Sequence, residues 1–229
     1  SIATVAATAA CDGDGQSGKR VQVLYARASD RADRFALYLP SFQQWAADAD
    51  AIFNESAADT GGSRRIRYVH DASCTPLVDN VVLSPTGDDS FGSTISELQA
   101  RGYNRSDRKY MVFVDANVYC GIGTVEYDDQ SGAGNLNNFG PSYGRVDAGC
   151  WSGEVAAHEL MHNLGGAQLS APHSTGGWHV TDDRDRMALS DAPYYPTIQL
   201  VCADRPSNRL FDCGHDDYYS TAPTAGSYL

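Results

Sequence analysis

The chain has 229 residues, of which 42% are hydrophobic, so it can bury one substantial core and we expect a single domain, residues 1–229. Its formal net charge is −12 at pH 7, and only two lysines accompany its fifteen arginines. Such an acidic surface repels phosphate backbones, which argues against nucleic acid as a partner.

The first half of the chain predicts three strands and two helices. In chain order, we expect a strand at Arg20–Ala26, a helix at Phe35–Ser56, a strand at Arg65–His70, a helix at Thr94–Arg101 and a strand at Lys109–Asp115. The longer helix contains Pro40, which must lie in its first turn or kink it. Lys109–Asp115 is the most apolar of these strands, so we expect it near the centre of a sheet.

Two shorter strands and a capped helix follow. We expect the strands at Tyr119–Tyr127 and Gly144–Cys150, on either side of a loop rich in Gly, Asn and Asp. Glu154–Leu164 has the pattern of a helix, with Ser152 as its N-cap and Gly165 as a left-handed C-terminal cap. The rest of the chain is rich in Pro and Gly, so we expect loops there. No internal repeat or linker marks a second large domain.

Six cysteines without a C-x-x-C pair indicate three disulfides rather than a thiolate zinc site or a redox motif, and hence an oxidising compartment. The alternative is that some of them are free and buried in a cytosolic protein. Among the 15 connectivities that six cysteines allow, we expect Cys202–Cys213, Cys120–Cys150 and Cys11–Cys74. No run reaches the 18 apolar residues of a membrane helix, and Ser1–Ala10 lacks the charged and apolar regions of a signal peptide. We therefore expect an already processed, secreted protein that does not bind a membrane.

The run H-E-x-x-H is the strongest functional signal in the chain. His158 and His162 are four residues apart, so on a helix they face the same way and can hold one zinc ion. Glu159 is offset by about 100°, enough to reach a water at the metal rather than the metal itself. Zinc lowers the pKa of such a water towards about 7, and the carboxylate can take its proton as the water attacks a carbonyl. The run predicts a zinc hydrolase with Glu159 as general base.

A catalytic zinc needs a third protein ligand, and the residues after the run limit the choice. The continuation to Gly165 matches H-E-x-x-H-x-x-G, and in this the chain resembles the metzincin metalloproteases. In the short form of that motif a third histidine lies three residues after the glycine, where this chain has Gln168, whose amide oxygen is a poor zinc ligand. His179 and His173 follow in a loop long enough to bring either one back to the metal. Met187 is the candidate for the methionine turn that lies beneath the zinc in metzincins.

The same stretch is similar to secreted bacterial sequences that have cysteines at the positions of Val180 and Ala188. This resemblance implies that the two positions face each other, which would bring His179 beside the methionine turn. His179 is therefore the expected third ligand, with His173 as the alternative and a carboxylate such as Asp182 after it.

The metzincin resemblance implies an α+β fold, a twisted mixed sheet with packed helices. The active-site helix would lie at the end of residues 1–165, and a loop-rich C-terminal subdomain, residues 166–229, would carry the third ligand and the methionine turn. In such enzymes the strand before the active-site helix forms the upper edge of the cleft and pairs with an extended substrate. Tyr119–Tyr127 is our candidate for that strand.

The resulting hypothesis is a secreted, monomeric zinc endopeptidase that acts on polypeptides. One alternative keeps the site but changes the bond, as in a zinc amidase acting on cell-wall or modified peptides. Another is a non-catalytic protein in which His158, His162, His173 and His179 form a closed structural zinc site. That alternative would leave Glu159 without a role.

Acidic residues in loops raise the question of calcium as a further cofactor. We interpret the pairs Asp128–Asp129 and Asp216–Asp217 as solvated loop acids. The stretch that begins at Asp12 resembles the start of a calcium loop, but Val23 stands where that loop requires a glutamate. Calcium is therefore a possible further cofactor, but no pattern in the sequence supports it.

Overall fold

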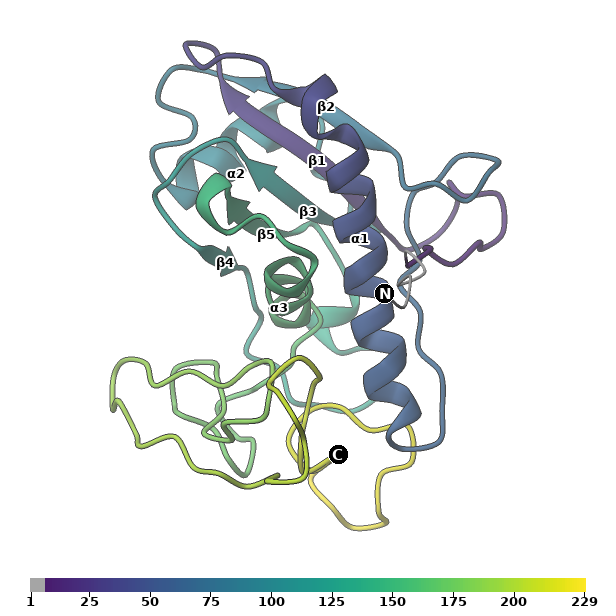
Figure 1. Ribbon diagram of the computed structural model, residues 1–229, viewed down its shortest axis with the longest axis vertical. Helices are drawn as coiled ribbons and strands as arrows, with labels where there is room; N and C mark the ends of the chain where they lie inside the picture. Colours follow the sequence, from purple (N-terminus) through teal and green to yellow (C-terminus); the bar gives the residue numbers. More distant parts are fainter. Residues whose placement is uncertain (1–6) are drawn as a thin grey trace, which may run out of the picture. The chain divides into compact units, whose positions relative to one another are not determined.

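The computed structural model describes residues 7–229, so residues 1–6 of the expected processed start lie outside the described part. In the described part the chain forms five β-strands and three α-helices (Figure 1). Their bounds are β1 Arg20–Ala28, α1 Phe35–Ala58, β2 Val78–Leu83, α2 Phe91–Ala100, β3 Arg108–Val114, β4 Gly121–Gly123, β5 Ser142–Asp147 and α3 Gly153–Asn163. Two short 3-10 turns precede β5 and α3, at Leu136–Asn138 and Ala148–Cys150.

The five strands form one mixed sheet in the order β2-β1-β3-β5-β4. β1 pairs in parallel with β2 and β3, β3 pairs in parallel with β5, and β4 pairs antiparallel with β5 at the edge. β3 lies in the middle of this order and all but one of its residues are buried, as its apolar sequence predicts. A mixed sheet with packed helices is the predicted fold class, and it is confirmed.

Helices cover both faces of the sheet. Successive side chains of a strand point to opposite faces, so the apolar strands present side chains that must be buried on each face. On one face, Tyr25 from β1 and Phe113 from β3 stack on Phe42 of α1, with ring centroids 5.3 and 5.1 Å from that of Phe42. On the other face, Leu98 of α2 belongs to the same buried cluster as Leu24 of β1. Figure 1 shows α1 crossing one face and α2 lying behind the other. Burying each of these large side chains contributes roughly 1.5–3 kcal/mol.

The prediction of a strand at Arg65–His70 is wrong. In the structure this segment makes only isolated bridges, one of them between Tyr68 and Val21. The place beside β1 is taken by β2, which pairs with it over six residues. β2 contains Asp79 and Asn80, residue types that are depleted in strands, so its composition concealed it.

The described chain divides into two compact units. The first contains the sheet and comprises the described residues up to Ala51, Arg65–Thr124 and Phe139–Leu160, and the second comprises Ile52–Arg64, Val125–Asn138 and Met161–Leu229. The chain therefore enters the second unit three times. The prediction of one domain with a subdomain boundary after residue 165 stays a prediction.

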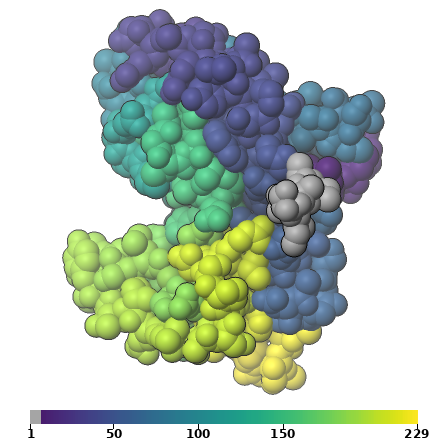
Figure 2. Space-filling view, in the orientation of Figure 1, coloured from purple at the N-terminus to yellow at the C-terminus, as the bar shows by residue number. Residues whose placement is uncertain are grey.

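The second unit is held by side-chain contacts more than by regular elements, as predicted for the C-terminal part of the chain. No helix or strand forms among the described residues after α3. Phe211 is buried and packs edge-on against Phe53, with ring centroids 4.8 Å apart. The yellow-green and yellow parts of this unit pack against each other (Figure 2). The Arg186 N–H donates to the Leu210 carbonyl at 2.9 Å.

Three disulfides pair the six cysteines as predicted. They join Cys11 to Cys74, Cys120 to Cys150 and Cys202 to Cys213. No helix in residues 7–229 is long and apolar enough to cross a membrane.

Candidate metal centre on helix α3

Helix α3 is capped at both ends by the residues that the sequence predicts. The Ser152 hydroxyl accepts a hydrogen bond from the N–H of Val155 at 3.1 Å. At the other end Gly165 has a φ of +84°, and its N–H donates to the His162 carbonyl at 3.0 Å. A Cβ at Gly165 would lie 2.7 Å from Nδ2 of Asn137, so both the conformation and the space require glycine. The two caps fix which residues occupy the last turns of the helix.

Three histidines come together at this helix. His158 and His162 lie one turn apart on α3. Within the second unit, the His179 imidazole lies edge-on to that of His162, with ring centroids 4.9 Å apart. The candidate ligand atoms of His158, His162 and His179 all lie within 4.8 Å of one another. Three imidazoles at this spacing fit one zinc ion, which binds histidine nitrogens at about 2.0–2.1 Å.

The orientation of His179 is set by a carboxylate. Nδ1 of His179 lies 2.6 Å from Oδ2 of Asp191. Because an ionised carboxylate can only accept a hydrogen bond, this contact puts the proton on Nδ1 and leaves the Nε2 lone pair for a metal. Asp191 is 12 residues from His179 in the chain, and no local pattern in the sequence marks it.

The segment that carries His179 is paired with the predicted methionine turn. Val180 and Ala188 form a bridge pair, as the resemblance to the bacterial sequences implies. The Val180 N–H donates to the Met187 carbonyl at 3.1 Å, and Met187 is fully buried. The Asp185 carboxylate accepts the Met187 N–H at 2.6 Å and so closes the turn. Burial raises the pKa of Asp185 to about 7.

Glu159 is the most perturbed carboxyl group of α3. It is 5% exposed, and its Oε2 has no hydrogen-bond partner among the described residues. Burial raises the pKa of Glu159 to about 8. Its Oε1 lies against the backbone of β4, since a Cβ at Gly121 would be 2.1 Å from it. A neighbouring cation would favour the ionised form, so a buried carboxyl without a partner fits a position beside a metal.

The strand predicted at Tyr119–Tyr127 is shorter in the structure, where only β4 pairs with β5. The Asp147 carboxylate accepts the N–H groups of Val118 and Tyr119 at 2.7 and 2.9 Å, which holds the chain in a loop before β4. β4 is the last strand in the order of the sheet. An edge strand presents backbone N–H and C=O groups to which an extended peptide can add.

The other predicted third ligands lie elsewhere. Nδ1 of His173 is 3.0 Å from Oδ2 of Asp217 and 3.6 Å from Oδ2 of Asp182, and these residues form a group separate from the histidines of α3. Gln168 is buried, and its Nε2 donates to the Glu126 carbonyl at 3.0 Å. It therefore fastens a loop of the second unit. Of the candidates, the structure brings only His179 to the α3 histidines.

The interpretation of Asp216–Asp217 as solvated acids is wrong for the second residue. Asp217 is 1% exposed, whereas the Asp216 side chain is 45% exposed. The burial follows from Asp212, whose carboxylate accepts the N–H groups of Asp217 at 3.2 Å and Tyr218 at 2.7 Å and so turns the loop inward. Local sequence carries no signal for this, because an Asp in a polar loop is usually solvated.

No protein-family model and no curated protein sequence matches this chain. Among solved structures, it is similar to metalloproteinase-II from Bacteroides fragilis, with 12% identity and a TM-score of 0.35 over 90% of this chain and 55% of that one. It is also similar to the structure of a chaperone–substrate complex, with 14% identity and a TM-score of 0.30 over 66% of this chain and 27% of that one. The chain thus spans about a quarter to a half of the length of these structures.

Proposed function

We propose that this protein is a secreted zinc-dependent endopeptidase. The observation that carries the proposal is the grouping of His158, His162 and His179, with their candidate ligand atoms within 4.8 Å of one another, on the helix that also holds the buried Glu159. Three histidines leave a fourth position of a tetrahedral zinc for water or substrate, which is the arrangement of a catalytic rather than a structural site. The separate position of His173 argues against a closed site of four histidines.

The residues of the site divide the chemistry among them. A zinc ion held by the three histidines would polarise the scissile carbonyl and lower the pKa of a water to about 7. Glu159 takes the proton of the attacking water and later donates it to the leaving amine. Asp191 keeps His179 in the tautomer and orientation that a ligand needs.

The substrate class follows from the sheet edge beside Glu159. Gly121 of β4 is in contact with the Glu159 carboxyl, so a peptide that adds to β4 would run past that group. We therefore propose that the substrate is an extended polypeptide. We also propose that the chain acts as a monomer. Three disulfides support an oxidising, extracellular location.

The test is the substitution Glu159→Gln, with Glu154→Gln as a matched control on an exposed position of the same helix. We expect Glu159→Gln to retain zinc and to reduce peptide-bond hydrolysis by about 10²–10⁴-fold. The control variant should retain both. Hydrolysis is measured by mass spectrometry on a peptide library, which also distinguishes an endopeptidase from an amidase by the bonds that are cut. Full activity of Glu159→Gln would refute the mechanism.

A further inference from the structure

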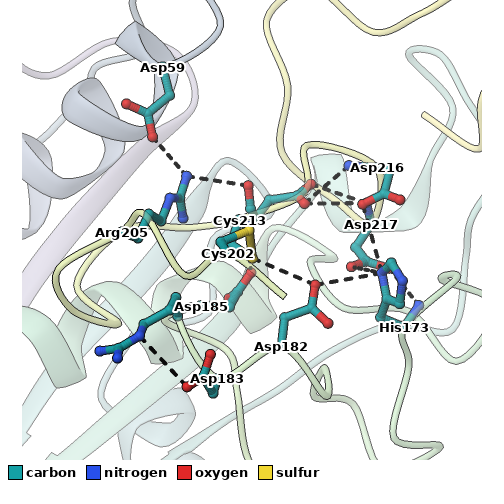
Figure 3. Close-up of a disulfide and its surroundings, with 12 residues drawn as sticks. Asp59, His173, Asp182, Asp183, Asp185, Cys202, Arg205, Cys213, Asp216 and Asp217 are labelled. Atoms are coloured by element: carbon teal, nitrogen blue, oxygen red, sulfur yellow. Dashed lines mark hydrogen bonds and ion pairs between the residues drawn. A yellow bond between two sulfur atoms is a disulfide. The ribbon is translucent and has the colours of Figure 1, made fainter. Parts of the chain in front are cut away.

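A second group of metal-binding side chains lies in the second unit. His173 is joined twice to Asp217, since its backbone N–H donates to Oδ1 at 2.7 Å and its Nδ1 lies 3.0 Å from Oδ2. The same Nδ1 is 3.6 Å from Oδ2 of Asp182. One ligand atom from each of the three residues lies within 4.8 Å of the others. Figure 3 shows the Asp182 and Asp217 carboxylates directed toward the His173 ring.

The backbone around Asp217 is held rigidly. The Asp212 carboxylate accepts the N–H groups of Asp217 and Tyr218, and the disulfide Cys202–Cys213 ties the segment down just before it. Arg205, inside the disulfide loop, donates to the Asp59 carboxylate at 2.7 Å (Figure 3). The position of the Asp217 carboxylate is therefore set by the fold before any ion binds, which lowers the cost of binding one.

The buried Asp182 carboxylate indicates that the group binds a ligand. Its side chain is 0% exposed, and its Oδ1 has no hydrogen-bond partner among the described residues. Its Oδ2 lies 3.8 Å from Sγ of Cys213, but that sulfur is in a disulfide and has no proton to donate. A buried carboxylate without a hydrogen-bond donor is strongly destabilising, so its charge must be neutralised, either by protonation or by a cation beside it.

A protonated His173 alone does not meet that requirement. It would bring one positive charge to the two buried carboxylates of Asp182 and Asp217. A third carboxylate is also near, since Oδ1 of Asp216 lies 3.8 Å from Nδ1 of His173. A divalent cation would balance both buried charges. The donor set also indicates which cation, because imidazole nitrogen suits zinc and similar transition metals, whereas calcium prefers oxygen ligands alone.

We propose that His173, Asp182 and Asp217 form a second divalent cation site that takes zinc and is separate from the α3 histidines. Its role is structural. His173 and Asp182 lie on either side of His179 in the chain, and the Thr181 N–H donates to the His173 carbonyl at 2.9 Å. A cation that joins them to Asp217 fastens the loop that carries His179 to the C-terminal segment.

The test measures zinc stoichiometry of the full chain rather than activity, so it does not depend on the proposed hydrolysis. After chelation and dialysis, zinc is titrated into the wild type and into the double variant His158→Ala/His162→Ala by calorimetry, with metal content checked by mass spectrometry. We expect two equivalents for the wild type and one for the double variant. Absence of tight zinc binding in the folded double variant would overturn the proposal.

Asp182→Asn in the double-variant background identifies the site. This nearly isosteric change should weaken the remaining zinc at least about 100-fold, whereas Asp183→Asn, the same change at the next residue, should leave it unchanged. Equal zinc affinity in the two variants would overturn the assignment. If circular dichroism shows that Asp182→Asn is unfolded, His173→Gln serves as the second variant, with the same expectation.

The identity of the ion is tested in the same background. X-ray absorption at the zinc edge of the double variant should report one imidazole with oxygen ligands, and calcium should bind more weakly than zinc. A spectrum with two or more imidazoles, or tighter calcium binding, would contradict the proposed donor set.

Discussion

Replacing Gly121 with alanine would put a Cβ atom 2.1 Å from Oε1 of Glu159 and 2.8 Å from its Cδ. The first distance is about 1.3 Å shorter than the 3.4 Å at which ordinary contact begins. The new methyl group cannot move aside, because Cγ1 of Val155 is only 2.9 Å from it. The Glu159 carboxyl group must therefore move by about an ångström. A displacement of this size at a general base costs on the order of 10²-fold in rate, or about 2.7 kcal/mol in the activation free energy.

The assay compares kcat/KM on one peptide substrate for Gly121→Ala and for Gly92→Ala. Gly92 is a matched control, because a Cβ there would meet nothing within 4 Å. We expect about a 100-fold loss for Gly121→Ala, with zinc content unchanged and stability lowered by no more than about 1–3 kcal/mol. The control should keep wild-type activity. If Gly121→Ala keeps the wild-type kcat/KM, the placement of Glu159 against β4 does not determine catalysis.

Three further changes test other parts of the site and the fold. Asp191→Asn should weaken zinc binding at the α3 histidines by about 10–100-fold, because it removes the carboxylate that accepts from His179 Nδ1 at 2.6 Å and orients the ring. The zinc affinity is measured by competition with a chelator in an Asp182→Asn background. Unchanged affinity would exclude a role of Asp191 in orienting His179. Asp185→Asn should remove a pH dependence of stability. Burial raises the folded pKa of Asp185 to about 7, above its unfolded value of 3.8, so its contribution to stability is full below about pH 4 and is lost as the pH rises through 7. Urea unfolding between pH 5 and 7 should show the wild type losing up to about 1.4 kcal/mol per pH unit relative to the variant, and parallel curves would contradict the raised pKa. Phe42→Ala should lower the unfolding free energy by about 3–5 kcal/mol, since the ring is fully buried between Tyr25 and Phe113; a loss below about 1 kcal/mol would contradict its place in the core.

The parts of the structure that sequence predicts well depend on local signals. The helix of the H-E-x-x-H run begins after the Ser152 cap and ends at Asn163, two residues before the Gly165 cap, because hydrogen bonds within a few residues decide both ends. β3 is equally clear, since residues 110–114 form the apolar run expected of a strand buried on both faces. The disulfides follow partly from spacing, as for Cys202 and Cys213, which are 11 residues apart.

The parts that sequence does not predict depend on contacts between distant residues. β2 is a strand because it pairs with β1, although Asp79 and Asn80 disfavour one. Asp217 reaches His173 across 44 residues, and Gly121 meets Glu159 from another element. The periodicity of hydrophobic residues along the chain does not indicate such contacts. The third histidine is an intermediate case, because the facing positions Val180 and Ala188 favour His179 only through resemblance to other sequences.

The proposed function requires that His158, His162 and His179 hold a zinc ion beside Glu159. The most direct measurement is an anomalous difference map at the zinc edge from crystals of the full chain grown with zinc. We expect a peak within about 2.0–2.1 Å of one nitrogen of each histidine, with a fourth position open to solvent near the Glu159 carboxyl. Absence of a peak at these histidines, or a fourth protein ligand that closes the site, would contradict the proposed zinc site.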